Sequence, residues 1–150
     1  MSEKTCCLIS PSDPSPNRGF QPRLHLKKAV LAAIDEGYTV FMSNFEHGNS
    51  IIFASVVAEL KASGQALILK AAIACKAQIH ETDLDLLETC DDIHLCSRQM
   101  TDESLMIRDR YMVDASDLIF YAHRKGADPF DLSIFQYAQA HDKPIRTLAI

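Results

Sequence analysis

The sequence lacks several residues and patterns that mark common classes of protein. It contains no tryptophan and only 5 glycines and 6 prolines in 150 residues, and its 5 cysteines form no C-x-x-C pair. An odd number of cysteines in a chain without an export signal favours reduced thiols. The adjacent Cys6 and Cys7 would point to opposite faces of a strand, so they cannot easily share one metal. We therefore expect buried cysteines and no metal site.

Clustered positive charge and long apolar runs are also missing. The formal net charge is -5, and lysine and arginine are scattered, whereas proteins that neutralise phosphates group these residues on one face. The most apolar region, residues 66–79, is interrupted by Lys70 and Lys76, and residues 1–5 lack the apolar run of a signal peptide. These absences predict a cytoplasmic protein with no membrane partner, for which nucleic acid is not the expected ligand.

Short aliphatic runs alternate with segments whose apolar residues have helical spacing. Strands are expected at residues 5–9, 39–43, 66–70, 93–96, 118–122 and 145–148, and helices at residues 22–37, 51–63, 83–89, 102–115 and 129–141. Several strands are apolar almost throughout, which is typical of a parallel sheet covered on both faces. The alternation predicts an α/β fold: a Rossmann-like, doubly wound, mostly parallel sheet with helices on both faces, in one domain over residues 1–150.

The most distinctive segment, residues 108–117, reads R-D-R-Y-M-V-D-A-S-D and runs directly into an apolar strand. It resembles the R-x-R-Y-M-V-D-x-S-D segment of YpsA-like proteins of the SLOG superfamily, which are related to DprA and to the LONELY GUY phosphoribohydrolases. The resemblance covers roughly residue 24 to the C-terminus. It implies a Rossmann-like fold and a nucleotide-related ligand held by glycine-rich loops at the carboxyl ends of the strands.

Three loops of the resembling family have altered counterparts in this chain. The T-G-H-R turn matches residues 9–13, S-G-G-A-x-G-x-D matches residues 43–50, and G-G-T matches residues 129–131. Of these patterns only Ser43 and Gly48 are kept. Asn44 and Phe45 replace glycines where a phosphate would approach, and Glu46 adds negative charge, as do two aspartates near the last helix. A like charge close to a phosphate costs on the order of several kcal/mol, so we expect a ligand with less phosphate, bound through hydroxyl and amide groups.

Segments 10–18, 43–50 and 123–131 are expected to form the ligand crevice together with the arginine-bearing helix. Arg108 and Arg110 are separated by about 200° around that helix, so the sequence leaves open which of them faces inward and which pairs with a carboxylate such as Asp114. The candidate ligand-binding residues are Ser10, Ser12, Arg18, Ser43, Asn44, Gly48, Asn49, Arg108, Arg110, His123, Asp128 and Asp131. No catalytic residue and no cofactor is assigned, His94 is expected in the core, and His47 is expected at the surface.

The leading hypothesis is a non-catalytic SLOG-type module that binds or senses a nucleotide-related or other polar metabolite. The first alternative is a hydrolase of nucleoside-phosphate N-glycosides, with Arg110 on the anion and Asp128 or Asp131 transferring the proton. The P-G-G-x-G-T-x-x-E motif of the LONELY GUY enzymes, whose glutamate assists cleavage, is absent. The second alternative is a degenerate member without ligand that assembles with itself, as a homo-oligomer, or with another protein.

Overall fold

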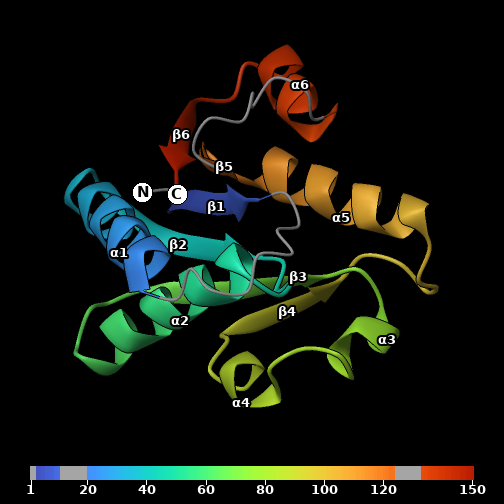
Figure 1. Cartoon of the computed structure of the whole chain (residues 1–150), viewed down its shortest axis with the longest axis horizontal. Coiled ribbons are helices and arrows are strands. Elements are labelled where there is room, and N and C mark those ends of the chain that lie inside the picture. Colours follow the sequence, from blue (N-terminus) through green and yellow to red (C-terminus); the bar gives the residue numbers. More distant parts are fainter. Residues whose placement is uncertain (1–2, 11–19, 124–132) are drawn as a thin grey trace.

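A computed structural model of the protein describes residues 3–10, 20–123 and 133–150. The strands are β1 (Lys4–Ile9), β2 (Tyr38–Ser43), β3 (Ile68–Ile73), β4 (Asp92–Leu95), β5 (Leu118–His123) and β6 (Ile145–Ala149), and they form one sheet in the order β4-β3-β2-β1-β5-β6. All five neighbouring pairs are parallel (Figure 1). The predicted doubly wound α/β fold is confirmed.

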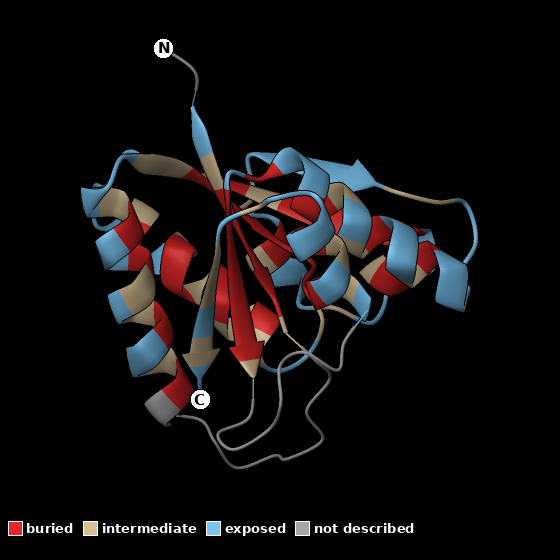
Figure 2. Cartoon of the chain, turned by 90° about the horizontal axis from the view of Figure 1, so that it is seen from above, coloured by how far each residue is buried: buried red, intermediate tan, exposed pale blue. Residues whose placement is uncertain are grey.

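The helices are α1 (Phe20–Asp35), α2 (Asn49–Ala62), α3 (Lys76–Ile79), α4 (Leu84–Leu87), α5 (Asp102–Ala115) and α6 (Ser133–Ala140). The hydrophobic core consists of two clusters, one on each face of the sheet. One cluster joins the sheet to α1 and α2, and the other joins it to α5 and α6. Figure 2 shows the central strands buried between helices whose outer faces are exposed.

Strand β1 shows how the sequence produces this two-sided core. Cys6 and Leu8 pack into the cluster on the α1 and α2 face, whereas Cys7 and Ile9 pack into the cluster on the α5 and α6 face. The two-residue period of a strand places successive side chains on opposite faces. The expectation that the adjacent cysteines are buried and face opposite sides is therefore confirmed, and both are free thiols.

Helix α5 begins and ends where the sequence predicted. The Thr101 hydroxyl accepts a hydrogen bond from the backbone N–H of Ser104 (3.0 Å), and the Ser104 hydroxyl accepts one from the N–H of Thr101 (2.8 Å). This reciprocal capping box satisfies two of the donors that a helix N-terminus leaves unpaired. The start of α5 is consequently fixed by its own sequence.

Other elements differ from the sequence-based expectations. Strand β3 begins two residues later than expected and extends to Ile73, because the second half of the apolar run is the buried half that pairs with β4. Helix α3 was not predicted, and α2 is capped by Gly48, whose φ is 96°, without the side-chain cap expected from Asn49 or Ser50. The start expected for the last helix, near residue 129, lies outside the described residues.

The expectation that His94 is a core residue is wrong. His94 lies in β4, whose four residues are all exposed, and its ring stacks on the ring of Tyr111 at 4.0 Å between centroids. The reason is topological, because β4 is the edge strand of the sheet and has a described neighbouring strand on one side only. Separately, no helix among the described residues combines the length and apolar character needed to cross a membrane.

Candidate functional site

The candidate site lies at the carboxyl end of β1, beside the point where the sheet reverses its winding. Strands β2 to β4 extend from one side of β1, and β5 and β6 extend from the other. Ligands of open parallel sheets bind outside the carboxyl ends of the strands at such a switch point. A cavity of about 310 Å³ is located here, and its polar lining includes Ser10, Glu46, Arg108, Asp109, Arg110 and Ser133.

Arg108 is the buried centre of the polar wall of this cavity, with only 1% of its surface exposed. Its Nη2 donates to Glu46 Oε1 (2.9 Å), and its Nε and Nη2 both lie 3.0 Å from Asp109 Oδ1. Its Nη1 lies 3.4 Å from Gln78 Oε1. A buried arginine is tolerated only when its charge is paired and its N–H groups have acceptors. Of the two arginines that the sequence could not separate, Arg108 is therefore the one that points inward.

The loop after β2 positions Glu46 for this contact. The Asn44 side-chain oxygen accepts from the Glu46 backbone N–H (3.0 Å), and the Asn44 carbonyl accepts from Gln78 Nε2 (2.7 Å). Phe45 has a φ of 57°, in the left-handed region that glycine adopts without cost, and its side chain is buried in the core. The position where the resembling family has a glycine thus keeps a glycine-like backbone but carries a core-forming side chain.

The described lining residues of the cavity do not favour a highly charged anion. They include two positive groups, Arg108 and Arg110, and three carboxylates, Glu46, Asp102 and Asp109, so these five groups together carry one net negative charge. Burial raises the pKa of Asp109, while the neighbouring guanidinium of Arg108 acts in the opposite direction. The positive charge of Arg108 is already balanced by two carboxylates. Among the described lining residues, Arg110 is then the side chain with positive charge to offer.

Arg110 is exposed at the cavity, and its guanidinium lies 5.1 Å from the centre of the Tyr137 ring. The hydroxyl of Tyr137 donates to the carboxylate of Asp114, at 2.9 and 3.0 Å. The expected ion pair between Arg110 and Asp114 is therefore absent from the described residues, because Asp114 is engaged by the tyrosine. A cation over an aromatic face is held in place without losing its charge.

The other sequence-predicted residues have varied surroundings. Ser10 lines the cavity and accepts from Asn49 Nδ2 (3.2 Å), whereas Asn44 is buried outside the cavity lining. Ser43 is also buried, and its hydroxyl donates to the Ser50 carbonyl (2.8 Å) and accepts from the N–H of Phe45 (3.1 Å).

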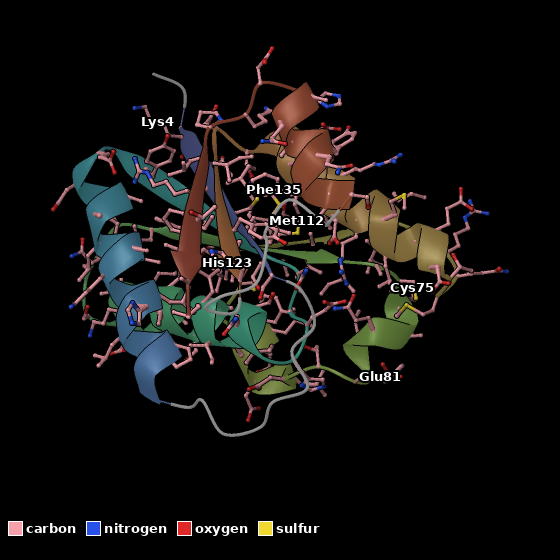
Figure 3. The ribbon with its side chains drawn as sticks, turned by 45° about the horizontal axis from the view of Figure 1, so that its top comes forward. Lys4, Cys75, Glu81, Met112, His123 and Phe135 are labelled. Carbon is pink, nitrogen blue, oxygen red and sulfur yellow. The ribbon has the colours of Figure 1, made fainter. Side chains whose placement is uncertain are left out.

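Gly48 caps α2. His123 ends β5 (Figure 3). It is half-buried and is not one of the residues that line the cavity. Ser12, Arg18, Asp128 and Asp131 lie outside the described residues.

Sequence reasoning missed Asp109 and Gln78 as members of this network. Asp109 follows Arg108 directly, but adjacent residues of a helix do not normally face each other, so spacing gave no signal. Gln78 lies on the short helix α3, 30 residues from Arg108. No local pattern could have linked them. Among the described residues, no group of three histidine, cysteine or acidic side chains is placed to hold a metal ion.

The fold and the cavity define a Rossmann-like α/β protein with a polar pocket at the switch point of a parallel sheet. Among solved structures, the chain is similar to DNA processing protein A from Helicobacter pylori, described for its single-stranded DNA binding mode. The TM-score is 0.65 at 15% identity, and the match covers 98% of this chain and 66% of that chain. This chain thus spans just under two thirds of its neighbour's length. At this identity the similarity shows the fold. No family model and no curated protein matches the sequence.

Proposed function

We propose that this protein is a SLOG-type module that binds a small nucleotide-related or other polar ligand without transforming it. The observation that carries the proposal is the network on the wall of the cavity in which the buried Arg108 contacts the half-buried carboxylates of Glu46 and Asp109. Burying an arginine with two carboxylates costs several kcal/mol of desolvation, and replacing such groups by apolar side chains is often neutral or stabilising. A charged network facing a cavity at the switch point is better explained by binding than by stability.

The chemistry of the lining defines the ligand class. A carboxylate offers about four acceptor sites, and Arg108 occupies only part of those of Glu46 and Asp109, which are 28% and 23% exposed in their side chains. Hydroxyl groups such as those of a ribose are suitable donors to these oxygens. Arg110 can bind one anionic group. The ligand that fits these features is a nucleoside or nucleoside monophosphate, in preference to a di- or triphosphate.

A thermal-shift screen tests this proposal. The purified protein is measured with nucleosides, with the matching mono-, di- and triphosphates, and with a single-stranded oligonucleotide. A ligand at a hundred times its dissociation constant adds about 2.7 kcal/mol, which is several degrees for a domain of this size. We expect the nucleoside or its monophosphate to stabilise most, and Arg110→Ala to lose the extra effect of the phosphate.

The matched control is Lys28→Ala, which removes an exposed cation on α1, away from the cavity. It should leave every shift unchanged. Stabilisation by the triphosphate above all others would contradict the ligand class, and stabilisation by the oligonucleotide alone would favour single-stranded DNA, the ligand named for the structural neighbour. Release of a free base from the monophosphate would replace the proposal with the hydrolase alternative.

A further inference from the structure

Helix α6 contributes one residue to the wall of the cavity and a second residue that contacts this wall. It lies beside α5 (Figure 1). Ser133, at the start of α6, lines the cavity, and Tyr137 follows four residues later. Residues at this spacing lie on the same face of a helix. Tyr137 is half-buried, and its ring lies 5.1 Å from the guanidinium carbon of Arg110, an exposed lining residue of α5.

Arg110 and Asp114 have the spacing of a helical ion pair, but another group holds the carboxylate. The two residues are four apart on α5, and opposite charges at this spacing normally attract each other. Within the described residues they form no ion pair, because the Tyr137 hydroxyl donates to the carboxylate oxygens of Asp114, at 2.9 and 3.0 Å. The Asp114 carboxylate raises the pKa of Tyr137 above its ordinary value, so the hydroxyl stays a donor at neutral pH. Asp114 is thus engaged by a neutral group.

The surroundings of Tyr137 hold its hydroxyl against Asp114. The ring of His141 packs on the Tyr137 ring at 4.1 Å between centroids, and His141 Nδ1 lies 2.9 Å from the backbone oxygen of Tyr137. Lys143 is also close, but its Nζ donates to backbone carbonyls, including that of Asp114 (3.3 Å). If the tyrosine hydroxyl were removed, Arg110 would therefore be the helical partner of the Asp114 carboxylate.

We propose that Tyr137 is a positioning residue that determines how strongly the cavity binds an anion. Its hydroxyl holds Asp114, and its ring supports the Arg110 guanidinium without reducing the charge of that group. The charge of Arg110 then stays available to the phosphate of a nucleoside monophosphate. The part that concerns the ligand rests on the proposed function. The part that concerns Arg110 and Asp114 holds in the protein without ligand and can be tested separately.

Chemical modification tests the state of Arg110 without a ligand. Phenylglyoxal reacts with guanidinium groups, and an ion pair with a carboxylate slows this reaction. At low salt we expect Arg110 to react about twofold more slowly in Tyr137→Phe than in the wild type, because an exposed helical ion pair is weak. High salt screens such a pair and should remove the difference. Tyr137→Phe combined with Asp114→Asn should restore the wild-type rate at low salt.

Tyr38→Phe is the matched control for this experiment. Lys4 lies over the Tyr38 ring at 5.3 Å from its centre, but Tyr38 begins β2 and is therefore at the opposite end of the sheet from the cavity. This variant should leave the rate of Arg110 unchanged, and circular dichroism verifies that each variant is folded. An unchanged rate in Tyr137→Phe, or a slower rate that neither high salt nor Asp114→Asn restores, would overturn the proposal.

Isothermal titration calorimetry with adenosine and adenosine monophosphate tests the consequence for binding. We expect Tyr137→Phe to lower the affinity for the monophosphate about twofold at low salt and to leave the affinity for adenosine unchanged. The variant that also carries Asp114→Asn should recover the affinity for the monophosphate. An equal loss for both ligands would indicate a purely structural role of Tyr137 and would overturn the proposal. Failure of both ligands to bind the wild type would instead contradict the proposed function, whereas the modification rates decide the role of Tyr137 on their own.

Discussion

Glu46 and Arg108 lie 62 residues apart in the sequence and meet at 2.9 Å on the wall of the cavity. The carboxylate occupies a guanidinium that would otherwise be available to an anion. This contact is the reason why we propose a ligand with little phosphate for this cavity. It also makes the preference open to experiment.

Glu46→Gln should increase the affinity of the cavity for phosphate. The substitution removes one of the two negative partners of Arg108, so the guanidinium gains positive charge to offer an anion. We expect inorganic phosphate and nucleoside diphosphates to raise the melting temperature of the variant more than that of the wild type. Without ligand, the free energy of unfolding should fall by about 1–3 kcal/mol, because the buried arginine is less well paired.

Glu81→Gln is the matched control for that experiment, because Glu81 is exposed and lies on the α3 side of the molecule (Figure 3). Equal phosphate stabilisation of the wild type, Glu46→Gln and Glu81→Gln would show that Glu46 does not screen the arginine.

Arg108→Met should destabilise the protein strongly at neutral pH and less in acid. Removal of the cation leaves Glu46 and Asp109 partly buried without their main partner, and breaking a buried pair costs about 3–5 kcal/mol. Protonation of the carboxylates relieves this penalty as the pH falls. Urea denaturation at neutral and acidic pH measures the difference, and a loss that does not change with pH would contradict the role assigned to the two carboxylates.

Asp109 should contribute a characteristic pH dependence to stability. Burial raises the pKa of its carboxyl in the folded protein above the ordinary value of 3.8, so the folded chain holds this proton to a higher pH than the unfolded chain. The contribution is complete below the ordinary value and is lost as the pH rises through the raised one. Comparison of the free energies of unfolding of the wild type and Asp109→Asn from about pH 3 to about pH 7 should isolate this slope; parallel curves would contradict it.

The cysteines should differ in their reactivity in the native state. Burial raises the pKa of Cys7 to about 12 and raises that of Cys6 as well, so neither thiol ionises near neutral pH. Cys96 is only half-buried, although burial raises its pKa too. Mass spectrometry after brief alkylation should find Cys96 modified well before Cys6 and Cys7. Equal labelling of the three cysteines in the native state would contradict this prediction. If addition of a stabilising salt then slowed the labelling of Cys6 and Cys7 alone, the cause would be local opening of β1.

Thr101→Ala should weaken the N-terminus of α5. It removes one half of the capping box with Ser104, and loss of a cap costs about 0.5–2 kcal/mol. Ser97→Ala, which removes a hydroxyl whose described hydrogen bond is a long one (3.3 Å) to the Gln99 carbonyl, is the control and should be close to neutral. Urea denaturation of both variants measures the contrast.

The sequence determined those features of the protein that depend on neighbouring residues. Alternating apolar runs fixed the α/β class, the two-residue period placed Cys6 and Cys7 on opposite faces, and the capping residues set the bounds of α5. These features are local because a helix or strand forms from the periodicity and end signals of its own segment.

Only the tertiary structure decided the composition of the cavity and the exposure of the sheet edge. The order of the strands brings the loop after β2 and helix α3 to α5, and it therefore selects Glu46 and Gln78 as partners of Arg108 across 62 and 30 residues. The same order places β4 at an edge, which leaves His94 and Leu95 exposed although the sequence pattern predicted a strand there. The hydrophobic pattern of the sequence indicates which residues can be buried. The position of each strand in the sheet determines which of those residues are buried.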